Sequence, residues 1–215
     1  MPAGASLPAT WGFSIDKAMD YSQLPTQEIE RLARVIHPGA WAIEPERPLA
    51  TLLGSCVAVC LFDPQARVGG LNHFMLPSIR RGSNDDVDSL LSGSYAMEAL
   101  LNALLQRGAK KIRLQAKAFG GGTIINTAGP SMSIGLRNAE FTKEWLDREG
   151  IPLLAADFLG PWSRKLLFLP TTGDAYCRRM VSNMATAEVI AREEKSYADT
   201  LAHKPVTTEK KIELF

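Results

Sequence analysis

The sequence is poor in cysteine and has almost no net charge. It has three cysteines among 215 residues, Cys56, Cys60 and Cys177, an odd number without repeated spacing. That count argues against a disulfide framework and fits a reducing compartment. The formal net charge is +1, so the clear basic excess of a phosphate-binding surface is missing. We therefore expect no nucleic-acid partner.

Long apolar runs are also missing. No stretch approaches the roughly 18 uninterrupted apolar residues of a spanning helix, and the N-terminus lacks the order of a signal peptide. These absences predict a cytoplasmic protein that is not membrane-inserted. The length favours one domain with extensions. We predict an N-terminal extension over residues 1–40, a central domain over 41–182 and a helical or disordered, solvated C-terminal tail over 183–215.

The most informative part of the chain is residues 49–77. Residues 49–62 are apolar and uncharged until Asp63, which predicts one buried strand, and residues 71–76 form a second apolar run after Gly69 and Gly70. Together they predict a hairpin. A turn centred near residue 65 would set Cys56 opposite Phe74, and a slip of one residue would set it opposite His73.

This hairpin offers the parts of a cysteine nucleophile. Such a nucleophile needs a base, a group that orients the base, and amide donors for an oxyanion. Cys56 and His73 could supply the thiol and the base, Thr51 or Asn72 the orienting group, and the backbone at Gly54 to Cys56 the donors. The competing interpretations are a buried thiol and a satisfied core histidine.

A metal site made from Cys56, Cys60 and His73 is only weakly indicated, because no second cysteine pair follows the Cys-x-x-x-Cys spacing. We expect no metal and no cofactor. Cys60 and Cys177 are interpreted as core thiols.

The rest of the chain predicts a mixed-sheet α/β layered domain. Helices are expected within residues 25–36, 94–107 (capped by Ser94), 138–149 (capped by Asn138) and 186–197, with an exposed loop over 78–92. Further strands are expected over residues 110–119, 151–158, 164–169 and 175–181. Three glycines at 120–122 predict either a tight structural turn or a backbone lip of a site.

Five motifs occur together in the order found in one known family. They are Leu-Gly-Ser-Cys-Val-Ala-Val-Cys-Leu-Phe-Asp at 53–63, Asn-His-Phe-Met-Leu-Pro at 72–77, Ala-Lys-Ala-Phe-Gly-Gly-Gly at 116–122, Ile-Gly-Leu-Arg-Asn at 134–138 and Thr-Gly-Asp at 172–174. From roughly residue 37 to 181 the chain thus resembles CheD, the chemoreceptor glutamine deamidases.

The resemblance implies hydrolysis of glutamine side chains to glutamate on cytoplasmic helices of chemotaxis receptors. It implies a three-layer α/β sandwich similar to the catalytic domain of cytotoxic necrotizing factor toxins. It also makes Cys56 the nucleophile and His73 the base. A CheC-type phosphatase is implied as a regulator, and methyl-ester hydrolysis as a side activity.

The resemblance implies Thr51 as the third catalytic residue. Thr51 lies five residues before Cys56, so in one regular strand the two side chains would point to opposite faces. Its participation therefore requires a bend, for which Gly54 is the natural place. Candidate substrate contacts are Ser55, Asn72, Phe119, Gly120 and Gly121.

Two other functions stay open on the sequence. One is a non-catalytic protein of the same fold that binds receptors or adaptors. The other is a cysteine amidase that acts on unrelated proteins.

Overall fold

The computed structural model describes residue 21 and residues 24–76, 85–123, 134–180 and 184–203. Its elements follow in the order α1 (Thr26–Leu32), β1 (Arg34–Val35), β2 (Trp41–Ile43), β3 (Leu49–Leu53), β4 (Val57–Asp63), β5 (Val68–Phe74), α2 (Asp85–Gln106), a 3₁₀ turn (Lys111–Arg113), β6 (Gln115–Gly120), α3 (Ile134–Arg148), β7 (Leu153–Phe158), β8 (Ser163–Leu169), β9 (Asp174–Met180) and α4 (Met184–His203).

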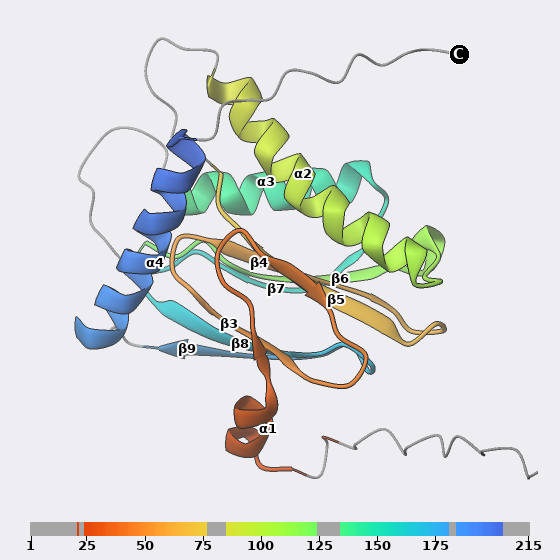
Figure 1. Cartoon of the computed structure of the whole chain (residues 1–215). Coiled ribbons are helices and arrows are strands. Elements are labelled where there is room, and N and C mark those ends of the chain that lie inside the picture. Colours follow the sequence, from red (N-terminus) through yellow and green to blue (C-terminus); the bar gives the residue numbers. More distant parts are fainter. Residues whose placement is uncertain (1–20, 22–23, 77–84, 124–133, 181–183, 204–215) are drawn as a thin grey trace, which may run out of the picture.

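The fold has three layers (Figure 1). Helices α2 and α3 cover one face of a five-stranded sheet of order β2-β5-β4-β6-β7, and a four-stranded sheet of order β1-β3-β8-β9 covers the other face. Both sheets are mixed, because β1 is parallel to β3 and β6 is parallel to β7 while the remaining pairs are antiparallel. The predicted mixed-sheet α/β class is confirmed.

Two hydrophobic clusters hold the layers together. One lies between the helices and the five-stranded sheet and includes the fully buried Trp145 and Leu100. The other lies between the two sheets and includes Leu49, Phe168 and Cys56. Strand β4 contributes to both, because its successive side chains point to opposite faces. Its burial on both sides explains why its sequence shows no polar alternation.

The prediction of one strand over residues 49–62 is wrong. The segment forms two strands, β3 in the four-stranded sheet and β4 in the five-stranded sheet. The small residues Gly54 and Ser55 allow the chain to cross from one sheet to the other between them. This crossing is the bend that the participation of Thr51 required.

The predicted hairpin of β4 and β5 is present, but neither expected register is. The structure pairs Val57 with Phe74 and Ala58 with His73. The connection is fixed by Asp63, whose carboxylate accepts hydrogen bonds from the N–H groups of Gln65 and Ala66 at 3.0 and 3.1 Å. Such an Asx-type turn sets the connection independently of the apolar pattern.

The starts of α2 and β6 also differ from prediction. Helix α2 begins at Asp85, so residues 85–92 are helical and Ser94 lies inside the helix. The remainder of the predicted loop, residues 78–84, lies outside the described residues. Lys111–Arg113 is a 3₁₀ turn with Ile112 94% exposed, so β6 begins only at Gln115.

The sequence predicted a solvated C-terminal segment, but helix α4 packs on the domain. It lies across one end of both sheets (Figure 1), with Ile190 buried and Tyr197 packed against the cluster between the sheets. In the described part of the chain, no helix combines the length and the apolar character needed to cross a membrane. The division into extension, domain and tail stays a prediction.

Candidate active site

The site is built on the crossing between β3 and β4, residues 54–56. Every carbonyl group of this turn is tied to the scaffold. The N–H groups of Gly122 and Gly121 donate to the carbonyls of Gly54 and Cys56 at 2.7 and 2.8 Å, and the Asn138 amide donates to that of Ser55 at 2.8 Å. With its acceptors held inside, the turn presents its donors outward.

The three glycines at 120–122 make this close approach of backbones. Gly120 has φ +124°, and a side chain there would collide with the carbonyl of Cys56. Gly121 has φ +67°, a conformation that favours glycine. Phe119 lies buried in the same cluster as Cys56. The glycine segment is thus a tight structural support that also borders the site, which combines the two predicted interpretations.

The outward donors of the turn are bonded to α4. The Ser55 hydroxyl donates to Glu194 Oε2 at 2.7 Å, and the Cys56 N–H donates to Glu194 Oε1 at 3.0 Å. Sequence reasoning missed Glu194, which lies in a charged run interpreted as solvated. The signal was the spacing of Ile190, Glu194 and Tyr197, which places a carboxylate on the buried stripe of an amphipathic helix.

Thr51 and His73 meet across the two sheets. Thr51 Oγ1 lies 2.8 Å from His73 Nδ1 and donates to the carbonyl of Ile36 at 2.7 Å. Because the single hydroxyl proton goes to Ile36, Nδ1 must carry a proton and donate to Thr51. The carbonyl of Ile36, 3.3 Å from Nδ1, can also only accept. This network assigns the lone pair of the imidazole to Nε2.

Cys56, the residue before β4, and His73 of β5 lie on the same face of the sheet. His73 pairs with Ala58, and Cys56 precedes Ala58 by two residues, which is the spacing of diagonal neighbours. His73 Nε2 is buried, and among the described residues no group hydrogen-bonds to it. A base with an unpaired lone pair thus lies one step along the sheet from a fully buried thiol.

Burial keeps both groups neutral. It raises the pKa of the Cys56 thiol well above its ordinary value, and the charge and hydrogen bond of Glu194 raise this pKa further. Burial lowers the pKa of His73 to about 4, partly opposed by its bond to Ile36. At neutral pH the pair is therefore thiol and imidazole, with the imidazole free to accept a proton.

The structure does not bring Asn72 to this site. Its side chain points to the helix layer, where Oδ1 accepts from the N–H of Val59 at 3.0 Å and Nδ2 donates to the carbonyl of Ala96 at 3.2 Å. Of the two orienting groups that the sequence left open, only Thr51 contacts His73. Asn138, predicted as a helix cap, is instead buried within α3 and bonds to Ser55 and to the N–H of Leu76.

Cys60 lies fully buried within β4, and Cys177 is partly buried in β9. Both thiols have raised pKa values because of burial, and that of Cys177 is about 11. Within the described residues, no group of three or more His, Cys, Asp or Glu side chains could hold a metal ion.

Fold and site together define a mixed α/β protein with a thiol, an imidazole and a hydroxyl gathered where its two sheets meet. The chain belongs to the CheD family. The family model described as CheD chemotactic sensory transduction matches residues 75–179.

Similar curated proteins carry the same family name. "Probable chemoreceptor glutamine deamidase CheD 2" of Dechloromonas aromatica is 92% identical over 197 residues, covering 92% of this chain and 100% of that protein. The protein of the same name from Burkholderia thailandensis is 45% identical, covering 92% and 100%. "Probable chemoreceptor glutamine deamidase CheD" of Xanthomonas campestris is 40% identical, covering 90% and 93%.

Two solved structures show a distant likeness to this chain. The hypothetical protein YfiH of Bacillus licheniformis has a TM-score of 0.37 and 14% identity, covering 56% of this chain and 50% of that one. A Neisseria meningitidis protein of family DUF152 has a TM-score of 0.38 and 11% identity, covering 63% and 65%. At these scores neither bears on function, and the likeness to cytotoxic necrotizing factor stays a prediction.

Proposed function

We propose that this protein hydrolyses the side-chain amide of selected glutamines on cytoplasmic helices of chemotaxis receptors, giving glutamate and ammonia and tuning chemotactic signalling. The observation that carries the proposal is the turn at residues 54–56, where the buried thiol of Cys56 lies on the same face of the sheet as His73 and next to the Cys56 N–H and Ser55 O–H donors. The names of the relatives indicate the receptor as substrate.

The proposed mechanism begins with the proton on the thiol. Thr51 accepts the Nδ1 proton of His73 and thereby keeps the Nε2 lone pair available toward Cys56. The low pKa of His73, about 4, keeps the imidazole neutral at neutral pH. Transfer of the thiol proton to Nε2 would create the thiolate together with an imidazolium that stabilises it, although neither group is charged at rest.

Cys56 Sγ then attacks the amide carbon, and the carbonyl oxygen becomes an oxyanion. The N–H of Cys56 is positioned to donate to that oxygen, because it already donates to a carboxylate oxygen of Glu194 at 3.0 Å. As the carbon–nitrogen bond breaks, the proton on Nε2 passes to the leaving nitrogen and ammonia departs. His73 then takes a proton from water, which cleaves the thioester and leaves glutamate.

The same proposal covers location and partners. We infer a cytoplasmic protein that works on the receptor helices near the membrane without inserting, and a CheC-type phosphatase as a candidate regulator. An acyl-enzyme of this kind could also be formed from a receptor methyl ester.

Mass spectrometry of receptor helices incubated with the wild-type protein and with Cys56→Ala tests the proposal. The wild type should produce the small mass gain of glutamine converted to glutamate, and Cys56→Ala should produce none. Cys60→Ala, which removes a thiol four residues further along β4, is the matched control and should stay active. A folded Cys56→Ala protein that still deamidates the helices would refute the mechanism.

A further inference from the structure

Glu194 is held where a reaction product would lie. It reaches from α4 to the turn at residues 54–56, which is 138 residues earlier in the chain. There its two carboxylate oxygens take the two outward donors, the Ser55 hydroxyl at 2.7 Å and the Cys56 N–H at 3.0 Å. The side chain that deamidation of glutamine would leave at a nucleophilic Cys56 is itself a glutamate.

The same two groups could hold a glutamine. The Cys56 N–H can donate to a carboxamide oxygen as well as to a carboxylate oxygen. The Ser55 hydroxyl donates to a carboxylate but can rotate to accept a proton from a carboxamide nitrogen. The Cys56 N–H and the Ser55 hydroxyl, which now bind Glu194, can thus hydrogen-bond to the substrate glutamine and to the product glutamate.

We propose that α4 is an internal competitor, a helix that occupies the substrate site of its own chain with Glu194 in the position of the product. A receptor helix must displace α4 before its glutamine can reach Cys56. This inference rests on the proposed function only for the identity of the displaced substrate, since the contact between Glu194 and the turn exists without it.

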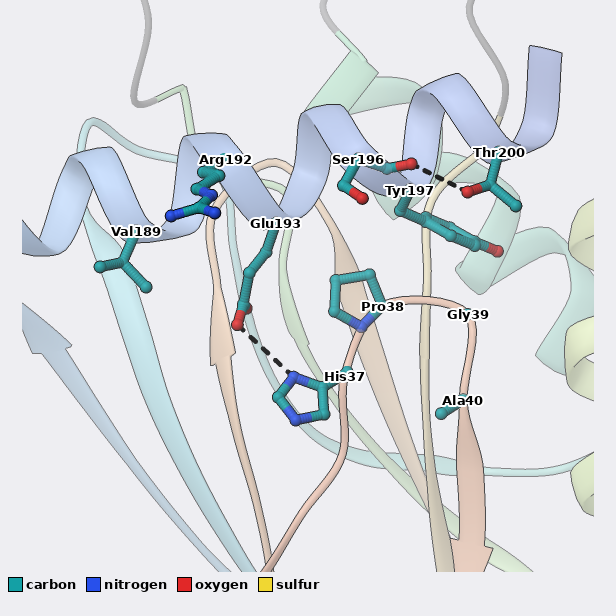
Figure 2. Close-up of a pocket in the computed structure, with 10 residues that line it drawn as sticks. All are labelled: His37, Pro38, Gly39, Ala40, Val189, Arg192, Glu193, Ser196, Tyr197 and Thr200. Atoms are coloured by element: carbon teal, nitrogen blue, oxygen red, sulfur yellow. Dashed lines mark hydrogen bonds and ion pairs between the residues drawn. The ribbon is translucent and has the colours of Figure 1, made fainter. Parts of the chain in front are cut away.

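The packing of α4 suits a helix that can leave. An open cleft of about 670 Å³ lies between α4 and residues 37–40 (Figure 2). Across this cleft, Glu193 and His37 approach to 3.5 Å. The Tyr197 ring packs so closely over Gly39 that any side chain there would collide with it. Together with the buried Ile190 and the contact of Glu194, these contacts hold α4 on the domain beside an open cleft.

The contact also restrains the nucleophile. Cys56 is fully buried, and after burial the charge of Glu194 is the largest cause that raises the pKa of its thiol. Departure of α4 would remove this negative charge and open the thiol to solvent, and both changes favour the thiolate. The internal competitor therefore blocks the site and also lowers the reactivity of Cys56.

Alkylation of Cys56 by iodoacetamide measures this restraint without any substrate. In Glu194→Ala, Cys56 should react roughly tenfold faster than in the wild type, because the carboxylate that holds α4 is gone. Glu188→Ala removes an exposed carboxylate from the same helix and should leave the rate unchanged. The buried Cys60 serves as an internal reference that stays unmodified.

The steady-state kinetics of receptor-helix deamidation should show the same competition. Glu194→Ala should lower KM roughly tenfold with little change in kcat, because substrate no longer has to displace α4. Glu188→Ala should match the wild type in both constants.

Glu194→Gln turns the helix into a substrate. Cys56 Sγ would bond to the side-chain amide carbon at position 194, the carbon–nitrogen bond would break with loss of ammonia, and water would cleave the thioester. Mass spectrometry should show the introduced amide converted to the acid within each purified chain, at a rate independent of protein concentration. In Glu194→Gln combined with Cys56→Ala the amide should persist.

The outcomes separate this inference from the proposed function. Unchanged alkylation and unchanged KM in Glu194→Ala, with a wild type that deamidates receptor helices, would overturn the competitor and leave the function standing. Faster alkylation of Cys56 without deamidation of any receptor helix would support the competitor and overturn the function. An amide at position 194 that survives in a protein active on receptor helices would refute the product-like position.

Discussion

The two ends of β4 satisfy their polar groups in opposite ways. At the end of the strand, the buried carboxylate of Asp63 accepts from the N–H groups of Gln65, Ala66 and Lys110 and pairs with Arg113 at 2.7 Å. At the start, the donors of Ser55 and Cys56 bond to Glu194, a residue of a separate helix. Each end has one carboxylate, but only that of Asp63 belongs to the strand itself.

The difference separates a structural site from a candidate active site. Buried polar groups need partners, and a permanent partner is the most stable solution. In a site that binds substrate and releases product, the hydrogen-bond donors need a partner that can be displaced. The unpaired Nε2 of His73, near the start of β4, fits the same interpretation, because an unpaired lone pair can accept a proton during a reaction.

The largest expected effect comes from His73→Gln. Losing the base should lower kcat for receptor-helix deamidation by about 10²–10⁴-fold, the usual contribution of general acid–base catalysis. His37→Gln is the control, because His37 is exposed and lies outside the Thr51–His73 network. Equal kcat values for His73→Gln and the wild type would show that His73 takes no part in the reaction.

Asp63→Ala should break the other end of the strand without touching the chemistry. We expect a loss of about 3 kcal/mol in the free energy of unfolding, because three backbone N–H groups and Arg113 lose their acceptor. Urea unfolding would measure it. Among molecules that remain folded, kcat should stay within about twofold of the wild type, since the change lies at the far end of the strand.

Glu149→Gln gives the matched comparison for Asp63. It weakens the partly exposed pair of Glu149 with Lys111, 2.8 Å apart, and should cost less than about 1 kcal/mol. If both substitutions lower the free energy of unfolding equally, the buried Asp63 network stabilises the fold no more than the partly exposed pair does.

Thr51→Val tests the orientation of the base. Valine keeps the shape of the side chain but cannot accept the Nδ1 proton, so we expect kcat to fall by about 10–100-fold with a smaller change in KM. Thr51→Ser retains the hydroxyl and should restore most of the rate. A similar loss in both variants would point to packing between the sheets instead.

The sequence predicts the class of the fold and two of the converging side chains, because these depend on local patterns. Apolar periodicity indicates the strands of the hairpin, and the Gly-Ser-Cys motif marks Cys56. The crossing between sheets at Gly54 could not be predicted in the same way. Residues 49–62 are uniformly apolar on both sides of the crossing, so the pattern carries no sign of a change of sheet.

The contacts of Glu194 and Asn138 with the turn at residues 54–56 could not be predicted from the sequence, for a different reason. Glu194 and Asn138 reach the turn only through the packing of α4 and α3, and their local patterns indicate a solvated helix and a helix cap. The predicted register of the hairpin was wrong because the apolar pattern does not show how Asp63 holds the turn. Its carboxylate fixes the connection one residue away from the expected pairing.

A further effect is the pH dependence that His73 gives to stability. Its pKa is about 4 in the folded protein and has the ordinary value of 6.5 when unfolded. As pH falls below 6.5, the unfolded chain binds a proton that the folded protein excludes, so stability decreases until pH reaches about 4. Above 6.5 this contribution is constant.

Between pH 6.5 and about 5.5 the loss should be about 1 kcal/mol, since one proton contributes at most about 1.4 kcal/mol per pH unit. Carboxyl groups with lowered pKa values, such as Asp157 at about 2, lose their contributions mainly as pH falls toward about 4 and below, so this window isolates the imidazole. Urea unfolding of the wild type and His73→Gln at both pH values measures the difference. Equal slopes would mean that burial does not lower the pKa of His73 in the folded protein.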